Sequence, residues 1–142
     1  SDPERVFLVV QANEVLAIDD ACCWELASAS IDGVKVRQPD TGQLYAFVGL
    51  ADAAIAANAY GLVQVYGYHS AVRVRSWTAG VPAIAKGTAL ACVSAVFCLE
   101  SYINYALATS SLTQVNVRFA GFALAAQASW TTKAIACFLK AL

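Results

Sequence analysis

The stretches FVGLADAA (Phe47–Ala54) and FAGFALAA (Phe119–Ala126) place Phe, Gly and an Ala-Ala pair at the same spacing, 72 positions apart (119 minus 47). Each stretch leads through a short polar turn into a run of alternating residues. At the same offset, Val63–Tyr66 falls on Ile135–Phe138. The sequence therefore predicts a unit of strand, small-residue turn and strand that occurs twice, because each such unit offers an apolar face for its copy or a neighbour to cover.

The composition is that of a single domain with an excess of apolar residues. The chain has 142 residues, of which 59% are apolar and 13% are charged, against about 45–50% and about 25% in soluble domains. A chain of this length forms one domain with its own core. The excess of apolar residues predicts surfaces that contact other proteins.

Charge and hydropathy argue against membranes and nucleic acid as partners. The longest stretch without an ionised side chain, Ala53–Val72, contains Asn58, Gln64 and His69 and is a poor transmembrane helix. The nine Lys and Arg residues are spread out and form no cluster that would neutralise a run of phosphates. Ser1–Arg5 lacks the layout of a secretion signal. We therefore expect a protein made in the cytoplasm that binds neither membranes nor nucleic acid directly.

A hairpin is predicted over Val34–Val48. Val34–Arg37 alternates apolar and basic residues, Pro39–Gly42 has the composition of a turn, and Leu44–Val48 alternates back. Cys23–Ala27 is expected to pair with this hairpin as a further strand.

The rest of the chain also favours strands. They are expected at Leu62–Tyr68, Ala71–Trp77, Val115–Phe119 and Ala134–Leu139. Ala53–Tyr60 is expected to form a short helical turn. Gly87–Leu99 is compatible with a strand or a helix, and a strand is favoured. The expected fold class is mainly β: a single-domain β-barrel or β-sandwich with short helical turns and an internal repeat.

Candidate catalytic and metal-binding groups are few. His69 is the only histidine, and no nucleophile motif accompanies it. The adjacent carboxylates Asp19 and Asp20 fit a solvated turn, and the five cysteines form none of the C-x-x-C pairs of a zinc site. We therefore expect no enzyme, no metal and no cofactor. The thiols are expected to be buried and reduced.

The interface is expected to combine the N-terminal segment with basic and aromatic residues. Residues 1–10 are predicted to form an arm or edge strand, because the apolar run Val6–Val10 can pair with the edge of an adjacent subunit. Residues 11–142 then form the single β domain. The candidate interface residues are Pro3, Arg5, Phe7, Arg73, Arg75, Trp77 and Trp130. Aromatic side chains also line sugar-binding faces, so a carbohydrate-binding β module is an alternative.

The run YGLVQVYGYHSAVRV (Tyr60–Val74) follows FVGLADAAIAANA and precedes KGTALAC (Lys86–Cys92). This pattern resembles small virion proteins of tailed bacteriophages that decorate or cement the head shell. FAGFALAAQASWTTKAIACFLKAL (Phe119–Leu142) closes the chain with an echo of it. The resemblance covers Ala21–Leu142 and rests on strand and turn patterns that contain no catalytic residue.

The resemblance implies a structural protein on the outer surface of the virion capsid, where it adds buried interface between capsomers. Its partners would be the major capsid protein of the same phage and further copies of itself, arranged as a trimer. A major capsid protein is an alternative, although the chain is short for one with a long extended loop. A tail or baseplate component is another alternative.

Overall fold

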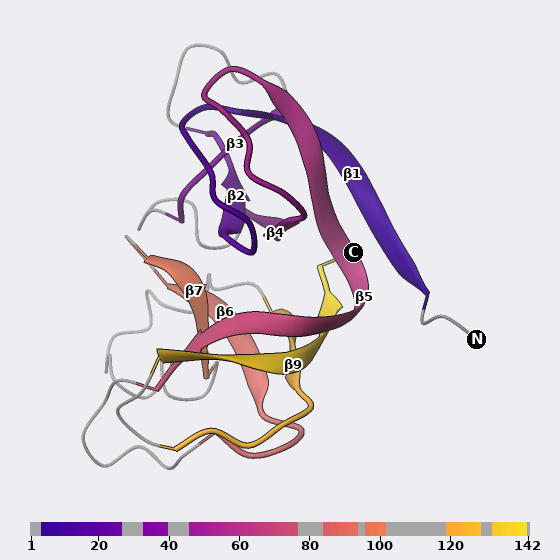
Figure 1. Ribbon diagram of the computed structural model, residues 1–142, viewed down its shortest axis with the longest axis vertical. Coiled ribbons are helices and arrows are strands. Elements are labelled where there is room, and N and C mark those ends of the chain that lie inside the picture. The colour runs from indigo at the N-terminus through magenta and orange to yellow at the C-terminus, as the bar shows by residue number, and fades with distance from the viewer. Residues whose placement is uncertain are drawn as a thin grey trace.

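The computed structural model describes residues 4–26, 33–39, 46–76, 84–93, 96–101, 119–128 and 132–141. These residues contain nine β-strands and no α-helix (Figure 1). The strands are β1 (Arg5–Ala12), β2 (Ala21–Trp24), β3 (Lys35–Arg37), β4 (Phe47–Ala51), β5 (Tyr60–Arg75), β6 (Ala89–Val93), β7 (Val96–Ser101), β8 (Phe119–Ala123) and β9 (Thr132–Lys140). The predicted fold class, mainly β, is confirmed.

The described strands all belong to one hydrogen-bonded sheet. Their order is β1-β3-β2-β4-β5-β7-β6-β8-β9. Two further pairings, β1–β5 and β5–β9, close this order into two circuits. Both circuits contain β5, which has 16 residues and runs from one circuit into the other (Figure 1). We call residues 4–67 the first lobe and residues 68–141 the second lobe.

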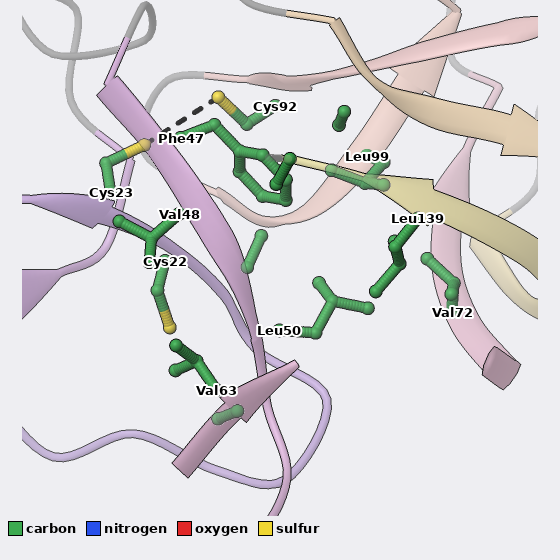
Figure 2. Packing of buried hydrophobic residues seen from close by; sticks show 14 of the residues in the cluster. Cys22, Cys23, Phe47, Val48, Leu50, Val63, Val72, Cys92, Leu99 and Leu139 are labelled. Atoms are coloured by element: carbon green, nitrogen blue, oxygen red, sulfur yellow. Dashed lines mark hydrogen bonds between the residues drawn. The ribbon is translucent and has the colours of Figure 1, made fainter. Parts of the chain in front are cut away.

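Alternation along the strands places their apolar side chains in a common core. In β5, Val72 and Val74 are fully buried, whereas Arg73 between them points to the opposite face and is partly exposed. The buried apolar residues of both lobes form one cluster, which includes Phe47 of the first lobe and Leu139 of the second (Figure 2). Each fully buried Phe, Leu or Val side chain contributes about 1.5–3 kcal/mol to folding.

The two lobes repeat the same strand pairing. The register of β2 on β4 matches that of β6 on β8, including a register shift before the third pair. The matched pairs are Ala21↔Leu50 with Ala89↔Phe122, Cys22↔Gly49 with Leu90↔Gly121, and Cys23↔Phe47 with Ala91↔Phe119. The sequence repeat is therefore a repeat of structure.

The turn before β2 is also repeated before β6. In the first lobe the backbone N–H of Ala17 donates to Oδ2 of Asp20 over 2.7 Å. In the second lobe the N–H of Ala85 donates to Oγ1 of Thr88 over 3.1 Å. The residue before the acceptor has a positive φ in both turns, 67° and 86°. Different side chains thus cap turns of the same geometry.

The shared strand β5 has two parts with different counterparts. Its first part, Tyr60–Gly67, corresponds to β9, and its second part, Tyr68–Arg75, corresponds to β1. The second part and β1 each run parallel to a short inner strand, through the pairs Val74↔Leu99 and Ala12↔Val36. When the two lobes are matched in this way, Ala12 is the counterpart of Val74. Counting back three residues along each strand, Val9 is the counterpart of Ala71.

The repeat offset changes after β4 and β8, which corrects the predicted alignment. Ala51 pairs with Val63 in the first lobe, and Ala123 pairs with Cys137 in the second. The separation is 12 residues (63 minus 51) in the first lobe and 14 (137 minus 123) in the second. The predicted match of Val63 with Ile135 is therefore wrong by two residues, because the second lobe has a longer connection.

The predicted hairpin over Val34–Val48 is wrong in its pairing. Strand β3 pairs with β1 and β2, and β4 pairs with β2 and β5. Strand β2 therefore lies between the two arms of the expected hairpin and contacts both. The local turn signal identified a reversal of the chain but could not show that an earlier strand enters between the arms. Of the expected turn, Pro39–Gly42, only Pro39 lies within the described residues.

The expected helical turn at Ala53–Tyr60 is also wrong. Ile55 forms an isolated antiparallel bridge with Leu16, and Asn58 has a positive φ of 64°. The side chain and backbone contacts of Ile55 outweigh the weak helix propensity of the neighbouring alanines. The same bridge recurs in the second lobe between Ile84 and Gln127.

The strand predictions agree with the structure in location and differ in extent. Leu62–Tyr68 and Ala71–Arg75 belong to one continuous strand, β5, with a register shift between His69 and Val72. The predicted end of the second strand, Trp77, lies outside the described residues. Gly87–Leu99 contains β6 and the start of β7, and Ala134–Leu139 lies within β9. Only Phe119 of the strand expected at residues 115–119 falls within the described residues, where it begins β8.

The N-terminal segment belongs to the sheet of its own chain. Strand β1 pairs with β5 from Arg5 to Gln11 and with β3 at Gln11 and Ala12. Val10 and Ala12 are fully buried. Residues 5–10 of the expected arm or edge strand thus form a strand that pairs within its own chain, and residues 1–3 lie outside the described residues. Among the described residues there is no membrane-spanning helix.

Candidate interaction surface and contacts between the lobes

Three large apolar side chains are exposed on the outer face of β1 and β5. Val9 is 67% exposed, Tyr60 is 65% exposed and Leu62 is 44% exposed. Val9 lies opposite Leu62, and Gln11 lies opposite Tyr60, so these side chains share one face of the strand pair. We call Val9, Tyr60 and Leu62 the apolar strip.

The equivalent face of the second lobe carries smaller side chains. The replacements are Val9 by Ala71, Tyr60 by Ala134, and Leu62 by Ala136. The two copies of the repeated unit therefore share a backbone arrangement but expose different side chains. The first lobe has the surface that favours contact with another protein, because large exposed apolar side chains are gathered there.

The edge of β1 that faces away from β5 is open over part of its length. The N–H of Ala12 donates to Ala59 beside β5, whereas the N–H groups of Gln11 and Asn13 donate to Val34 and Val36 at β3. Hydrogen-bonding direction alternates along an antiparallel strand. The N–H of Val9 therefore points away from β5, where no described residue pairs with it. We call this side of Arg5–Val10 the open edge.

The same edge in the second lobe is closed by a side chain. The N–H of Ala71, which corresponds to that of Val9, donates to Nδ1 of His69 over 3.2 Å. His69 Nε2 lies 3.1 Å from Oδ1 of Asp19 in the first lobe. The imidazole thus accepts a backbone hydrogen bond at Nδ1, and its Nε2 faces the carboxylate of Asp19. His69, the only histidine of the chain, seals an edge and joins the two lobes.

A second polar contact between the lobes involves Asp20. The side chain of Asp20 is buried, and its Oδ1 pairs with the guanidinium of Arg73. Its other oxygen, Oδ2, caps the turn at Ala17. Because both oxygens have partners within the chain, the carboxylate is stabilised where it is and is not directed to a ligand.

Cys22, Cys23, Cys92 and Cys137 are buried in the core. Burial raises the pKa of Cys22 to about 12 and that of Cys137 to about 12. The Sγ atoms of Cys23 and Cys92 lie 3.7 Å apart, across the contact between the lobes (Figure 2). This hydrogen bond, together with burial, raises the pKa of Cys23. Thiols held in the protonated form are weak nucleophiles.

The predicted interface residues do not form one site. Arg5 and Phe7 lie at the start of β1, beside Gly67 and Gln64 of β5. Arg73 and Arg75 lie at the other end of β5, and Arg73 contacts Asp20. The remaining candidates, Pro3, Trp77 and Trp130, are outside the described residues.

Sequence reasoning missed the apolar strip. A signal for it was present, because the run Val6–Val10 has no polar residue at alternate positions. A strand that is apolar at every position is either buried on both faces or exposes apolar side chains on one of them. Val9 and Leu62 show the second outcome.

The described residues contain no group of three or more side chains suited to hold a metal ion. Comparison with known protein families and with curated proteins found no match for this chain.

Proposed function

We propose that this protein is a structural virion subunit that cements or decorates a phage head shell through protein–protein contacts. The observation that carries the proposal is the apolar strip of Val9, Tyr60 and Leu62, which lies on only one of two equivalent faces. Large apolar side chains in a contiguous group favour burial against a partner.

The use of the polar residues supports a scaffold role. Asp20 and Arg73 pair with each other, and His69 bonds to Asp19 and to the backbone. Buried Glu25 accepts hydrogen bonds from Asn13 and Arg37 in the same way. The side chains that the sequence offered as candidate catalysts therefore stabilise the fold.

The strip explains how such a subunit would attach. A stable interface buries about 1,200–2,000 Å² and has an apolar centre within a polar rim. The strip supplies that centre, and polar residues such as Gln11 flank it. The net charge of −1 leaves attachment to depend on burial of apolar surface rather than on long-range electrostatic attraction.

The test is co-sedimentation of the purified chain with heads of its own phage that lack this protein. Leu62→Lys places a charge in the strip, and we expect it to weaken binding by at least about tenfold, or about 1.4 kcal/mol. The control is Val15→Lys, because Val15 is 71% exposed but lies outside the strip. A wild-type chain that ignores the heads, or a Leu62→Lys variant that binds as well as the control, would contradict the proposal.

The carbohydrate-binding alternative receives less support from the exposed tyrosines. Tyr60 and Tyr68 are exposed on β5, but they are eight residues apart, which is about 26 Å along a strand. One sugar ring cannot stack on both. Binding of the wild-type chain to a glycan array, lost on Tyr60→Ala, would favour that alternative over the shell.

A further inference from the structure

We propose that the open edge of β1 binds the β1 strand of a second copy, so that two chains join through an antiparallel strand pair. The carrying observation is the contrast between two equivalent amides. Ala71 N–H is bonded to His69, whereas Val9 N–H points outward with no described partner. An unpaired strand edge of this kind is a template for pairing with another chain.

The size of the edge restricts what can occupy it. The open edge spans Arg5–Val10 and ends where β3 begins to pair with β1, at Gln11. An occupant must therefore be a strand of about six residues, since sheet pairing needs at least a few consecutive residues. It must also be uncharged in its middle, because Val6–Val10 carries no polar group to match a charge.

β1 itself meets both requirements. In an antiparallel pair centred on Phe7, Val9 lies opposite Arg5 of the second copy, and every paired residue stays clear of Gln11, where β3 is bound. The outward N–H and C=O groups of Val9 then bond to those of Arg5 of the second copy, and the twofold axis passes through the Phe7 pair. Each Arg5 lies opposite a valine, whereas a parallel pair would place the two Arg5 side chains next to each other.

The side chains agree with the backbone. Leu8 is 37% exposed and Val9 is 67% exposed in the single chain. The strand pair would cover part of both, and β1 stands at the outer flank of the molecule beside β5, where a second chain has access (Figure 1). Leu62 of the apolar strip lies on β5, and β1 separates it from the open edge. Leu62 therefore remains available to another partner.

This inference goes beyond the proposed function and does not depend on it. Strand pairing is a property of the purified chain, whereas attachment to a shell requires heads. The pairing gives a twofold dimer, in contrast to the trimer implied by the resemblance to cement proteins, and the mass of the assembly in solution separates the two.

The experiment is sedimentation equilibrium of the full chain, combined with hydrogen exchange at the Val9 amide. We expect a dimer in which exchange at Val9 slows as the chain concentration rises. Val9→Pro removes the outward N–H, which an edge strand tolerates, and should raise the dissociation constant of the dimer at least about tenfold, the loss expected for a pair of symmetric hydrogen bonds. Val9→Thr keeps the N–H and the β-branched shape, and should dimerise within about threefold of wild type.

Circular dichroism checks that each variant is folded. If Val9→Pro does not fold, the concentration dependence of hydrogen exchange at the Val9 amide of the wild-type chain tests the proposal by itself. Three results would overturn the proposal: a wild-type chain that stays monomeric, a trimer, or a dimer whose Val9 amide exchanges as fast at high concentration as at low. A folded Val9→Pro variant that dimerises like wild type would also overturn it.

Discussion

The two lobes share a strand pattern, but the same edge of that pattern is closed by a side chain in the second lobe and open in the first. In the second lobe, the imidazole of His69 bonds to the Ala71 N–H and reaches Asp19. In the first lobe no described side chain bonds to the N–H of Val9, and the edge is open. The difference shows that pairing register is fixed by the buried side of a strand, whereas the exposed side is free to change. One copy can then be closed for stability while the other is kept for contact.

The largest expected effect tests whether the lobes share a single core. Phe47→Ala removes a fully buried ring from the first lobe and should lower the free energy of unfolding by about 3–5 kcal/mol. Phe122→Ala in the second lobe removes a ring that is only partly buried and should lower it less. Chemical denaturation followed by fluorescence and by circular dichroism measures both. Two separate transitions in either variant would show that the lobes unfold independently and that the core is not common.

The next prediction tests the equivalence of the lobes at matched glycines. A Cβ at Gly49 would overlap the carbonyl oxygen of Gln64, and a Cβ at Gly121 would overlap that of Phe138. Gly49→Ala and Gly121→Ala should each lower the free energy of unfolding by about 3 kcal/mol, the upper end for an overpacked site. Gly33→Asn is the control, because Gly33 has open space around it and Asn tolerates its positive φ. A large loss at only one of the two glycines would contradict the equivalence.

The ion pair between the lobes should have a smaller effect. Arg73→Met leaves the buried Asp20 carboxylate with only its turn hydrogen bond, and should lower the free energy of unfolding by about 1–3 kcal/mol. The equivalent residue of the first lobe is Gln11, whose hydrogen bond to Asn58 is exposed. Gln11→Met should therefore change stability by less than about 0.5 kcal/mol. Equal losses in thermal denaturation of the two variants would mean that the Asp20–Arg73 pair does not contribute as the structure indicates.

A single exchange can make the two edges alike. His69→Phe removes the acceptor for the Ala71 N–H and should lower the free energy of unfolding by about 1 kcal/mol. Hydrogen exchange at Ala71 should become faster. His69→Gln retains an acceptor and serves as the matched control. If exchange at Ala71 is the same in His69→Phe and wild type, His69 does not seal this edge.

The thiols should respond in the same way in both lobes. The pKa values of Cys22 and Cys137 rise from 9.0 to about 12 on folding because of burial. The native state therefore holds protons that the unfolded state releases, so the stabilisation is complete below pH 9 and is lost as the pH rises from 9 to about 12. At pH 8 both thiols should react with iodoacetamide only after unfolding. Rapid labelling of either thiol in the folded chain would refute its burial.

The sequence allowed the repeat, the strand content and most strand positions to be predicted. The Phe-Gly pattern at Phe47 and Phe119 identified the repeat, and β4 and β8 begin at these two residues. The structure shows why the glycine two residues later occurs in both, since a close backbone contact requires it in each lobe. The alternation of Val72 and Val74 with arginines located the second part of β5. These signals are local, since they depend on side-chain period and on backbone crowding within one strand pair.

Features that depend on distant parts of the chain were not predicted. The insertion of β2 between β3 and β4 and the pairing of Leu16 with Ile55 involve no local pattern. The role of His69 was not predictable either, because its partner Asp19 lies 50 residues away (69 minus 19) and the imidazole replaces a strand contact. The apolar strip had a weak signal in Val6–Val10, which predicted an arm or edge strand because nothing in the sequence shows the pairing of β1 with β5.

The crossing of β5 from one circuit to the other also indicates how such a fold can originate. Arg5 lies opposite Gly67 and Lys140 lies opposite Tyr66, so β1 begins and β9 ends beside the same two residues of β5, on its two sides. A link from β9 into β1 would therefore produce a second crossing strand like β5. Two half-length chains that associated as a pair would present two such junctions, and joining one of them yields the present topology. Gene duplication and fusion would then need one new connection and no rearrangement of strands.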